Sequence, residues 1–547
     1  MRRSATLVTA LAAVAVAGVL VLPATVAGAS GLPPIPIGAI QVGLFGPSCP
    51  SPTTGSIQTA INAAPSGATI YVCPGTYNES LTINKSLTLD GAQYGVDART
   101  RAGSETIITG TGGITYSPGA GTGTVNGFTL NGYTGGTGEI TASNAGSGWT
   151  FTDNVIDVSN GGIYLNTNGI ANPSPTSIAG NQFVQATPSW ANSGDFGQAI
   201  LIWANTGNNV TIANNAFVNL SGPGAAINTT GNACAGLSKN LTISGNSFVD
   251  NGAPFTDPNN GPGFIDENFA ALFCTSNAHV TNNTATITDV NDANASTPIY
   301  LGGSDFNTSV TGNVLVGNGA NQAAGISLNS NFYAPGTGVV ISGNRISGFL
   351  YGISVHGDAN DANNAAPTGY TISQNSVLHS TYGIRITKVG DLGPGSPSGT
   401  ITGNMLSNIT TDCVDATSGV LTAGTNNTWT GNGGTTNAPA GLGCGFLAPI
   451  ITSASSAAAK VGVPFSFTVT SVGFGIPAVS IGSLPTGLSF TLHSDGTATI
   501  SGIPGSTSAG KTSKAYAVKV TASNVQPVGK HLKKVSAKQV LTLTVSH

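Results

Sequence analysis

Short apolar runs alternate with polar turns through the middle of the chain, and the turns are centred on asparagine. Clear copies read Ile178-Ala179-Gly180-Asn181-Gln182-Phe183 and Ile243-Ser244-Gly245-Asn246-Ser247-Phe248. Neighbouring centres lie 23 to 37 residues apart, at Asn154, Asn181, Asn215, Asn246, Asn283, Asn313, Asn344, Asn375, Asn404 and Asn427. Each apolar run is short, so it predicts a β-strand whose successive side chains point to opposite faces.

A second short strand lies between successive asparagine turns. It reads Gly162-Ile163-Tyr164-Leu165, Gly325-Ile326-Ser327-Leu328, Gly352-Ile353-Ser354-Val355 and Gly383-Ile384-Arg385-Ile386. The later copies overlay by their buried isoleucines, Ile299, Ile326, Ile353 and Ile384. The outward positions are then Tyr300, Gly302, Ser327, Asn329, Ser354, His356, Arg385 and Thr387. With strands about 4.8 Å apart, we expect His356 and Arg385 to be near neighbours on one face.

This repeat predicts an all-β solenoid. One such unit cannot bury its apolar side chains alone, whereas stacked units bury a continuous column. Gly-Asn suits a sharp corner because both residues tolerate left-handed backbone angles, and stacked asparagines can form a hydrogen-bonded ladder. The alternative is a β-sandwich with many Asn-Gly turns, which the regular recurrence disfavours.

The start of the array predicts a helical cap. Ile57, Ala60, Ile61 and Ala64 recur at helical spacing after Ser56, a candidate N-cap without a capping box. Such a helix would cover the open end of the first coil.

The same region resembles the opening of pectin-lyase-like right-handed parallel β-helix proteins. The resemblance is carried by residues 56–61, by Ala68-Thr69-Ile70-Tyr71-Val72, by Pro74-Gly75-Thr76-Tyr77-Asn78-Glu79, and by Leu87-Thr88-Leu89-Asp90-Gly91. It covers about residues 50 to 440 and implies a right-handed parallel β-helix over residues 30–444. The fold hosts lyases, hydrolases, esterases and non-catalytic surface proteins, so the resemblance leaves the function open.

Residues 445–547 form a second region with a different pattern. Phe465, Phe467 and Val469 alternate, as do Leu541, Leu543 and Val545, and turn signals separate the runs. About a hundred residues of short alternating strands predict a small β-sandwich. The stretch from Leu484 to Phe490, the run Ala498-Thr499-Ile500-Ser501-Gly502-Ile503-Pro504, and Val520-Thr521-Ala522-Ser523-Asn524 resemble immunoglobulin-like modules of bacterial surface proteins. The region lacks the Cys…Trp…Cys core of antibody domains.

The first 29 residues read as a secretory signal peptide: Arg2 and Arg3 precede an apolar stretch that ends at Ala27-Gly28-Ala29. No later stretch is long enough to span a membrane, so we expect a secreted or cell-surface protein. None of the six cysteines forms a Cys-x-x-Cys pair, which argues against zinc. Short separations and export instead favour disulfides. The expected pairs are Cys49–Cys73, Cys234–Cys274 and Cys413–Cys444.

Charge divides the chain at the same boundary. Residues 30–444 hold seven Lys and Arg against twenty Asp and Glu, whereas residues 445–547 hold eight Lys and only Asp495. A basic domain on an acidic rod could anchor to anionic cell-wall polymers by electrostatic attraction, and the alternative is solubility alone. Nucleic acid is not an expected partner, because no recognition helix and no aromatic–basic interleaving occur.

Candidate chemistry gathers late in the solenoid. Val355-His356-Gly357-Asp358 and Arg385-Ile386-Thr387-Lys388 resemble two segments of polygalacturonases, but the Asp-Asp pair of that family is absent. Hydrolysis of a glycoside needs two placed carboxyl groups, and only Asp305 and Asp358 offer a divergent pair. We therefore take His356, Arg385, Lys388 and Asp358 as candidate catalytic or uronate-binding residues. The plain alternative is an Arg–Asp surface pair that bridges coils.

Two further sets of residues bear on ligands. Calcium, which pectate lyases use, has candidate oxygen ligands here: Asp266, Glu267, Asp289, Asp292, Asp358 and Asp361. Outward aromatic rings that can stack on sugars are Tyr164, Trp203 and Tyr300. The sequence thus predicts a β-helix that binds extracellular polysaccharide or serves as a structural surface module, with a pectate-type lyase as the alternative and a glycoside hydrolase less favoured. It predicts no resident metal or cofactor, and no oligomeric state follows from it.

Overall fold

The computed structural model describes residues 32–547 with several gaps. The gaps are 136–137, 144–146, 167–173, 186–197, 204–207, 219, 221–224, 231–233, 235, 251–267, 288–296, 320–323, 331–333, 357–365, 388–396, 446–448, 473–476, 494–496 and 529–530. The predicted signal peptide, residues 1–29, lies outside the described residues and stays a prediction. Among the described residues, no helix combines the length and the apolar character that crossing a membrane requires.

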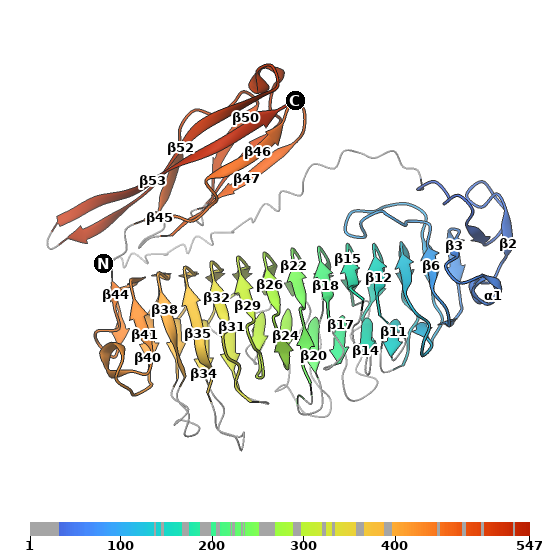
Figure 1. The fold of residues 1–547 in the computed structure, drawn as a ribbon, viewed down its shortest axis with the longest axis horizontal. Helices are drawn as coiled ribbons and strands as arrows, with labels where there is room; N and C mark the ends of the chain where they lie inside the picture. Colours follow the sequence, from blue (N-terminus) through green and yellow to red (C-terminus); the bar gives the residue numbers. More distant parts are fainter. Residues whose placement is uncertain are drawn as a thin grey trace, which may run out of the picture.

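Three long parallel sheets form a rod, and each coil of the chain contributes one strand to each sheet in turn (Figure 1). Sheet 1 runs in the order β2 (Pro52–Thr54), β1 (Ile40–Val42), β3 (Thr69–Val72), β6 (Leu87–Asp90), β9 (Gly123–Asn126), β12 (Trp149–Thr152), β15 (Thr176–Ala179), β18 (Val210–Ala213), β22 (Thr242–Ser244), β26 (His279–Thr281), β29 (Ser309–Thr311), β32 (Val340–Ser342), β35 (Thr368–Ser373), β38 (Ser398–Thr402) and β41 (Thr428–Thr430).

Sheets 2 and 3 follow the same order along the rod. Sheet 2 comprises β4 (Gly75–Tyr77), β7 (Thr106–Ile108), β10 (Phe128–Leu130), β13 (Val155–Asp157), β16 (Gln182–Val184), β19 (Ala216–Val218), β23 (Ser247–Asp250), β27 (Thr284–Ile287), β30 (Val314–Val316), β33 (Arg345–Ser347), β36 (Ser376–Leu378) and β39 (Met405–Ser407). Sheet 3 comprises β5 (Leu81–Ile83), β8 (Ile114–Tyr116), β11 (Ile140–Ser143), β14 (Ile163–Asn166), β17 (Ile200–Trp203), β20 (Ile227–Thr230), β24 (Ala270–Leu272), β28 (Ile299–Leu301), β31 (Ala324–Asn329), β34 (Tyr351–His356), β37 (Tyr382–Ile386), β40 (Thr411–Asp415) and β43 (Asn437–Ala438).

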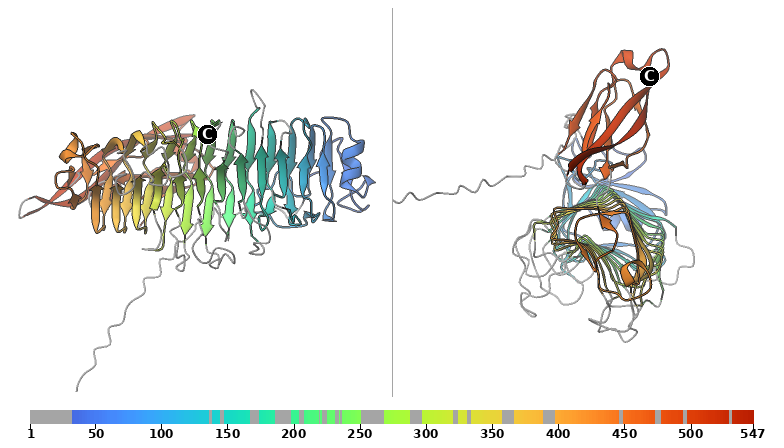
Figure 2. Two further views of the ribbon diagram at one scale, coloured as in Figure 1. Left: turned by 90° about the horizontal axis from the view of Figure 1, so that it is seen from below. Right: turned by 90° about the vertical axis from the view of Figure 1, so that its left-hand side faces the viewer.

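This architecture is the predicted right-handed parallel β-helix. Viewed along the rod, successive coils nearly superpose (Figure 2), and parallel crossovers are right-handed in almost all proteins. Inward side chains of the three sheets form one continuous apolar column. In it, the rings of Phe183 and Phe217 stack with centroids 4.9 Å apart. Each coil therefore buries its apolar side chains against its neighbours, as the repeat predicts.

The predicted cap helix is also present. Helix α1 (Ile57–Ala63) buries Ile57, Ala60 and Ile61 over the first coils. The Ser56 side chain accepts a hydrogen bond from the Thr59 backbone. Although no capping box is present, the Glu79 carboxylate accepts hydrogen bonds from the Ser56 hydroxyl and from the backbone N–H groups of Ile57 and Gln58. The helix N-terminus is thus satisfied by a later strand connection.

The corner between sheets 1 and 2 is an asparagine ladder. Each side chain donates from Nδ2 to Oδ1 of the asparagine in the next coil, at 2.9 to 3.1 Å. The members are Asn154, Asn181, Asn215, Asn246, Asn283, Asn313, Asn344, Asn375, Asn404 and Asn432, all buried. The residue before each member has a left-handed backbone with φ between 54 and 67°, which explains the preference for Gly and Asn there.

One predicted member of the repeat is wrong. Asn427 does not join the ladder, and its place is taken by Asn432, which accepts from Asn404. Asn427 instead lies buried at the end of the rod, where its Oδ1 accepts from the Tyr370 hydroxyl at 2.6 Å and from the Gly399 N–H at 2.7 Å. A buried amide that is held by three coils stabilises the end of the column.

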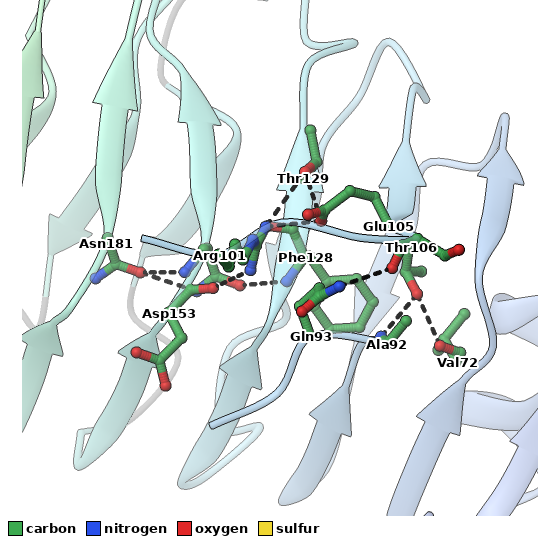
Figure 3. A network of polar contacts seen from close by, with 12 residues as sticks. Val72, Ala92, Gln93, Arg101, Glu105, Thr106, Phe128, Thr129, Asp153 and Asn181 are labelled. Atoms are coloured by element: carbon green, nitrogen blue, oxygen red, sulfur yellow. Dashed lines mark hydrogen bonds and ion pairs between the residues drawn. The ribbon is translucent and has the colours of Figure 1, made fainter. Parts of the chain in front are cut away.

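A connection between β6 and β7 covers the start of the ladder. In Figure 3, the Arg101 guanidinium donates to the carbonyl oxygens of Phe128 and Asp153 and forms an ion pair with Glu105 at 2.9 Å. The Arg101 side chain is 2% exposed, so these partners offset the loss of hydration that burial of the charge entails. The network ties the connection to several coils at once.

All three predicted disulfides are present: Cys49–Cys73, Cys234–Cys274 and Cys413–Cys444. Such bonds persist in oxidising compartments, so they indicate an extracellular environment. Two short sheets and a helical turn complete the rod: β21 (Ser238–Lys239) with β25 (Thr275–Ser276), β42 (Asn432–Gly433) with β44 (Cys444–Gly445), and η3 (Thr422–Gly424).

The C-terminal residues form a β-sandwich, hereafter the sandwich (residues 450–547). Its strands are β45 (Ile450–Ile451) with β48 (Ser471–Val472); β46 (Ser456–Lys460), β53 (His531–Ser546), β52 (Ser513–Val528) and β49 (Ala478–Ile481) in one sheet; and β47 (Phe465–Val469), β51 (Ala498–Gly502) and β50 (Leu488–Leu492) in another, with η4 (Ser506–Ala509). Its core is a separate apolar cluster that includes Val469, Ile500 and Leu543. The immunoglobulin-like relationship and the independent folding of residues 445–547 stay predictions.

Candidate functional site

The outward face of sheet 3 carries the candidate site residues that the structure describes. The predicted overlay is confirmed, because Ile299, Ile326, Ile353 and Ile384 pair in register on successive strands. The first outward row is therefore Tyr300, Ser327, Ser354 and Arg385. In the second row, Asn329 pairs with His356. The isoleucines point into the column, so alternation directs these other side chains away from it.

An aromatic pair lies near the middle of this face. The rings of Phe273 and Tyr300 have centroids 5.7 Å apart and are tilted by 55°. Gly302 makes room for them, because a Cβ there would lie 2.0 Å from Cε1 of Phe273 and 2.7 Å from Cε1 of Tyr300. Both rings are only partly buried. A glycine in this strand end thus allows two rings to approach the backbone closely.

A second aromatic group lies two to three coils further along. The rings of Tyr351 and Tyr382 stack with centroids 5.3 Å apart and an interplanar angle of 27°. The Arg385 guanidinium carbon sits 4.8 Å from the centroid of the Tyr351 ring. A guanidinium over an aromatic face is held by cation–π attraction, which fixes a side chain that would otherwise be mobile. All three side chains are partly exposed.

Small polar side chains separate the two aromatic groups. Ser327 and Ser354 occupy the row between Tyr300 and Arg385 and are 4% exposed. The Ser327 hydroxyl lies 3.3 Å from Nε2 of His356. We call this surface the sheet 3 strip. Its members are Phe273, Tyr300, Ser327, Tyr351, Ser354, His356, Tyr382 and Arg385.

The predicted four-residue cluster is only partly described. His356 and Arg385 both lie in the strip. Their strands pair so that Arg385 is opposite Ser354, two residues before His356, which is a diagonal arrangement in the sheet. Arg385 extends over Tyr351, while His356 contacts Ser327. Lys388 and Asp358 lie outside the described residues, so their proximity to this pair stays a prediction.

The other predicted aromatic residues lie on the same face but closer to the N-terminal end. Tyr164 belongs to the row of Tyr300, four strands earlier, which places them about 19 Å apart along the rod. The Tyr164 hydroxyl accepts a hydrogen bond from Asn166 at 3.3 Å. Trp203, at the end of β17, is partly exposed in the second outward row. The face therefore presents aromatic side chains along much of its length.

Asp305 is buried in the corner that follows β28, so it cannot meet a substrate on the strip. Its carboxylate is wholly buried and accepts a hydrogen bond from the Thr275 hydroxyl at 2.6 Å. Burial raises the pKa of Asp305 to about 7. The proposed Asp305–Asp358 hydrolytic pair thus lacks an accessible first member, because an acid or base must reach the glycosidic oxygen or its water.

The predicted calcium ligands give no site to describe. Among the residues that the structure describes, no group of three or more His, Cys, Asp or Glu side chains could hold a metal ion. All six predicted calcium ligands, Asp266, Glu267, Asp289, Asp292, Asp358 and Asp361, lie in the gaps. A calcium site on the connections around sheet 3 remains a prediction.

A protein-family model matches the part of the chain that contains the strip. Residues 249–436 match the family model described as "Protein of unknown function (DUF1565)". No curated protein matches the chain. The matched segment contains every residue of the strip.

Among solved structures, the chain is similar to a mannuronic acid specific polysaccharide family 6 lyase from human gut microbiota. That match has 14% identity, covers 69% of this chain and 82% of the lyase, and has a TM-score of 0.38. The chain is also similar to a tailspike protein mutant of E. coli bacteriophage HK620 in complex with a pentasaccharide. That match has 13% identity, covers 89% of each chain, and has a TM-score of 0.24.

Sequence reasoning missed three members of the strip. Tyr351 and Tyr382 stand at the same place in Tyr-Gly-Ile segments of consecutive coils, and this repeated triplet is the signal that could have found them. Each tyrosine precedes a buried isoleucine by two residues, so strand alternation predicts that its side chain points inward. The two rings instead stack on the outer face. Phe273 directly precedes Cys274 at the end of a coil, and its sequence setting carries no comparable signal.

Proposed function

We propose that the protein binds an extracellular acidic polysaccharide along the sheet 3 strip. The observation that carries the proposal is the register of one row, in which Tyr300, two serines and Arg385 follow one another on successive strands. This row crosses the strands, so a chain that follows it runs along the axis of the rod. Repetition of coils thus matches the repetition of a polymer.

The chemistry of the strip suits sugars that carry carboxylates. The partly exposed rings of Phe273, Tyr300 and Tyr382 offer flat apolar faces, on which the C–H faces of a pyranose can pack. Arg385 presents a planar set of donors that matches a carboxylate bidentately. Its position over Tyr351 reduces the conformational freedom that would otherwise be lost on binding. The serine, asparagine and histidine groups between the rings supply hydrogen-bonding partners for hydroxyl groups.

The test is affinity electrophoresis of the full chain in gels that contain polygalacturonate or alginate. We expect Arg385→Ala and Tyr300→Ala each to weaken binding about tenfold, the scale of one lost charge-assisted or aromatic contact. The matched control is Arg345→Ala, because Arg345 is a partly exposed arginine at the start of a strand of sheet 2. The control variant should bind like the parent protein.

Equal binding by Arg385→Ala, Tyr300→Ala and the parent would refute the proposal. The same samples also test the lyase alternative, since β-elimination leaves unsaturated sugar ends that absorb ultraviolet light. Such ends would show cleavage if they appeared only with calcium and were lost in Arg385→Ala, with an unchanged melting temperature. The strip would then be the active site of a lyase as well as a binding surface.

A further inference from the structure

One face of the larger sheet of the sandwich carries four outward lysines. In the four-stranded sheet β46-β53-β52-β49, Val518, Val520, Leu541 and Leu543 point into the core. Their alternating neighbours point out, and the outward lysines are Lys460, Lys519, Lys534 and Lys538. We call this surface the lysine face.

Strand pairing puts these lysines on the same side of the sheet. Lys519 pairs with Val540, and Lys538 pairs with Thr521, so Lys519 and Lys538 are diagonal neighbours, about 7–8 Å apart at Cα. Lys534 pairs with Val525 further along the same hairpin. Lys460, on β46, pairs with Ser546 on that side. The charges therefore form an extended array along the sheet.

The surroundings leave these charges accessible. The outward residues beside them are mostly small, such as Ala458, Ala517 and Ser480, and they are exposed. The described residues of the sandwich contain no Asp or Glu. Lys519 and Lys538 are close enough to repel each other in the free protein, whereas Lys460 and Lys534 lie further along the sheet. An extended anionic polymer that follows the sheet can pair with each of the four.

We infer that the lysine face is a second binding surface for the same acidic polysaccharide, taken here to be a polyuronate. The inference rests on the proposed function of the strip for its choice of polymer. The rod is acidic, with seven Lys and Arg against twenty Asp and Glu in residues 30–444. The sandwich, with eight Lys against Asp495 alone in residues 445–547, therefore attracts a polyanion more strongly than the rod does. Two linked surfaces on one chain raise the overall affinity above that of either one.

The test compares two double variants of the full chain that lose the same charge. Lys534→Gln with Lys538→Gln removes half of the lysine face. Lys511→Gln with Lys514→Gln removes two lysines outside it, since Lys514 faces the opposite side and lies over the ring of Tyr516. We expect the first variant to bind polygalacturonate about five- to tenfold more weakly. The control should differ from the parent by less than twofold.

Varying the salt concentration and the charge of the polymer further tests the lysine face. Binding by the parent should weaken steeply with salt, because exposed charges are screened, and fully methyl-esterified pectin should not bind the face. Equal losses in both double variants would show that net charge alone matters and would overturn the inference. Tighter binding of polyphosphate than of polygalacturonate, at equal charge concentration, would overturn the choice of polyuronate.

The two proposals fail in different ways. If Arg385→Ala binds like the parent while the Lys534/Lys538 variant is weakened, the strip is refuted and the lysine face stands. If Arg385→Ala is weakened while the Lys534/Lys538 variant binds like the parent, the lysine face is refuted and the strip stands.

Discussion

The asparagine corner and the outward face of sheet 3 are two lines along the same rod with opposite designs. The corner repeats one residue in ten coils, buries every side chain and bonds each one to the next. The face varies along the rod: its first outward row begins with three threonines and ends with Tyr300, two serines and Arg385 before β40, and most of its larger side chains are partly exposed. At the buried corner, the hydrogen bonds between stacked side chains require the same residue in every coil. On the outward face, residues can differ between coils without loss of the fold, so binding or catalytic side chains can occur there.

The largest effect is expected when one asparagine of the ladder is replaced. The Asn313 side chain donates to Asn344 and to the Val280 carbonyl oxygen, and its Oδ1 accepts from Asn283. Asn313→Ala leaves these buried groups unpaired, so we expect a loss of about 3–5 kcal/mol in the free energy of unfolding. Chemical denaturation followed by circular dichroism measures it.

The control on the face is Ser327→Ala, which removes a hydroxyl that contacts His356 from β31, a strand of the same coil as Asn313. It should change stability by less than about 1 kcal/mol. If the two variants unfold at the same denaturant concentration, the ladder contributes no more than the face, and the contrast drawn between them is wrong.

The ladder was predictable because its signal is local. Two adjacent residues, a left-handed residue followed by Asn, define every corner, and the left-handed residue is Gly or Asn in all but two corners, where it is Asp153 and Gln374. The same simplicity caused the one error, since Asn426-Asn427 and Gly431-Asn432 both fit this two-residue signal at the end of the array. Only the three-dimensional register shows that Asn432 continues the stack while Asn427 bonds to Tyr370 and Gly399.

The face was predictable only in part. The isoleucines set the register of sheet 3, so the row of Tyr300 and Arg385 followed from strand alternation. Tyr351 precedes its isoleucine by two residues and lies next to a corner, where alternation no longer decides the direction of a side chain. The burial of Asp305 could not be inferred either. Gly303-Ser304-Asp305 reads as an exposed turn, and the partner that encloses it, Thr275, comes from the preceding coil.

A second test uses the ionisation of that buried carboxyl. The asparagine corner carries no charge at any pH, whereas the corner after β28 buries Asp305, whose pKa burial raises to about 7. Between about pH 4 and 7 the folded protein keeps this proton and the unfolded chain loses it. Stability should therefore fall as the pH rises through this range and level off above it.

Asp305→Asn should remove this contribution, which is on the order of 1 kcal/mol for each pH unit. Melting temperatures of the parent and the variant at several pH values between 4 and 8 measure the slope. Glu139 and Asp90, whose pKa values burial raises to about 7 and about 6, act in the same direction and remain in the variant. The slope should accordingly decrease without vanishing. An unchanged slope would mean that Asp305 is hydrated in solution.

The smallest effect is expected from Arg385→Lys, a variant that tests whether the planar guanidinium or only the positive charge of Arg385 is needed for binding. Arg385→Lys keeps a cation on the face, but an ammonium group is a compact donor that lacks the planar fork and stacks poorly on Tyr351. We expect binding of polygalacturonate to weaken about three- to fivefold, less than in Arg385→Ala, because the net attraction survives while bidentate pairing is lost. Stability should stay within about 0.5 kcal/mol of the parent, as is usual for a change on an outward face. Affinity electrophoresis and thermal melting of the same samples measure both quantities.

If lysine binds as well as arginine, the cation alone is recognised and the stacked geometry at Tyr351 has no role in binding. If the lysine variant loses stability as Asn313→Ala does, Arg385 belongs with the structural corner, and the division between a structural line and a binding line fails at this residue.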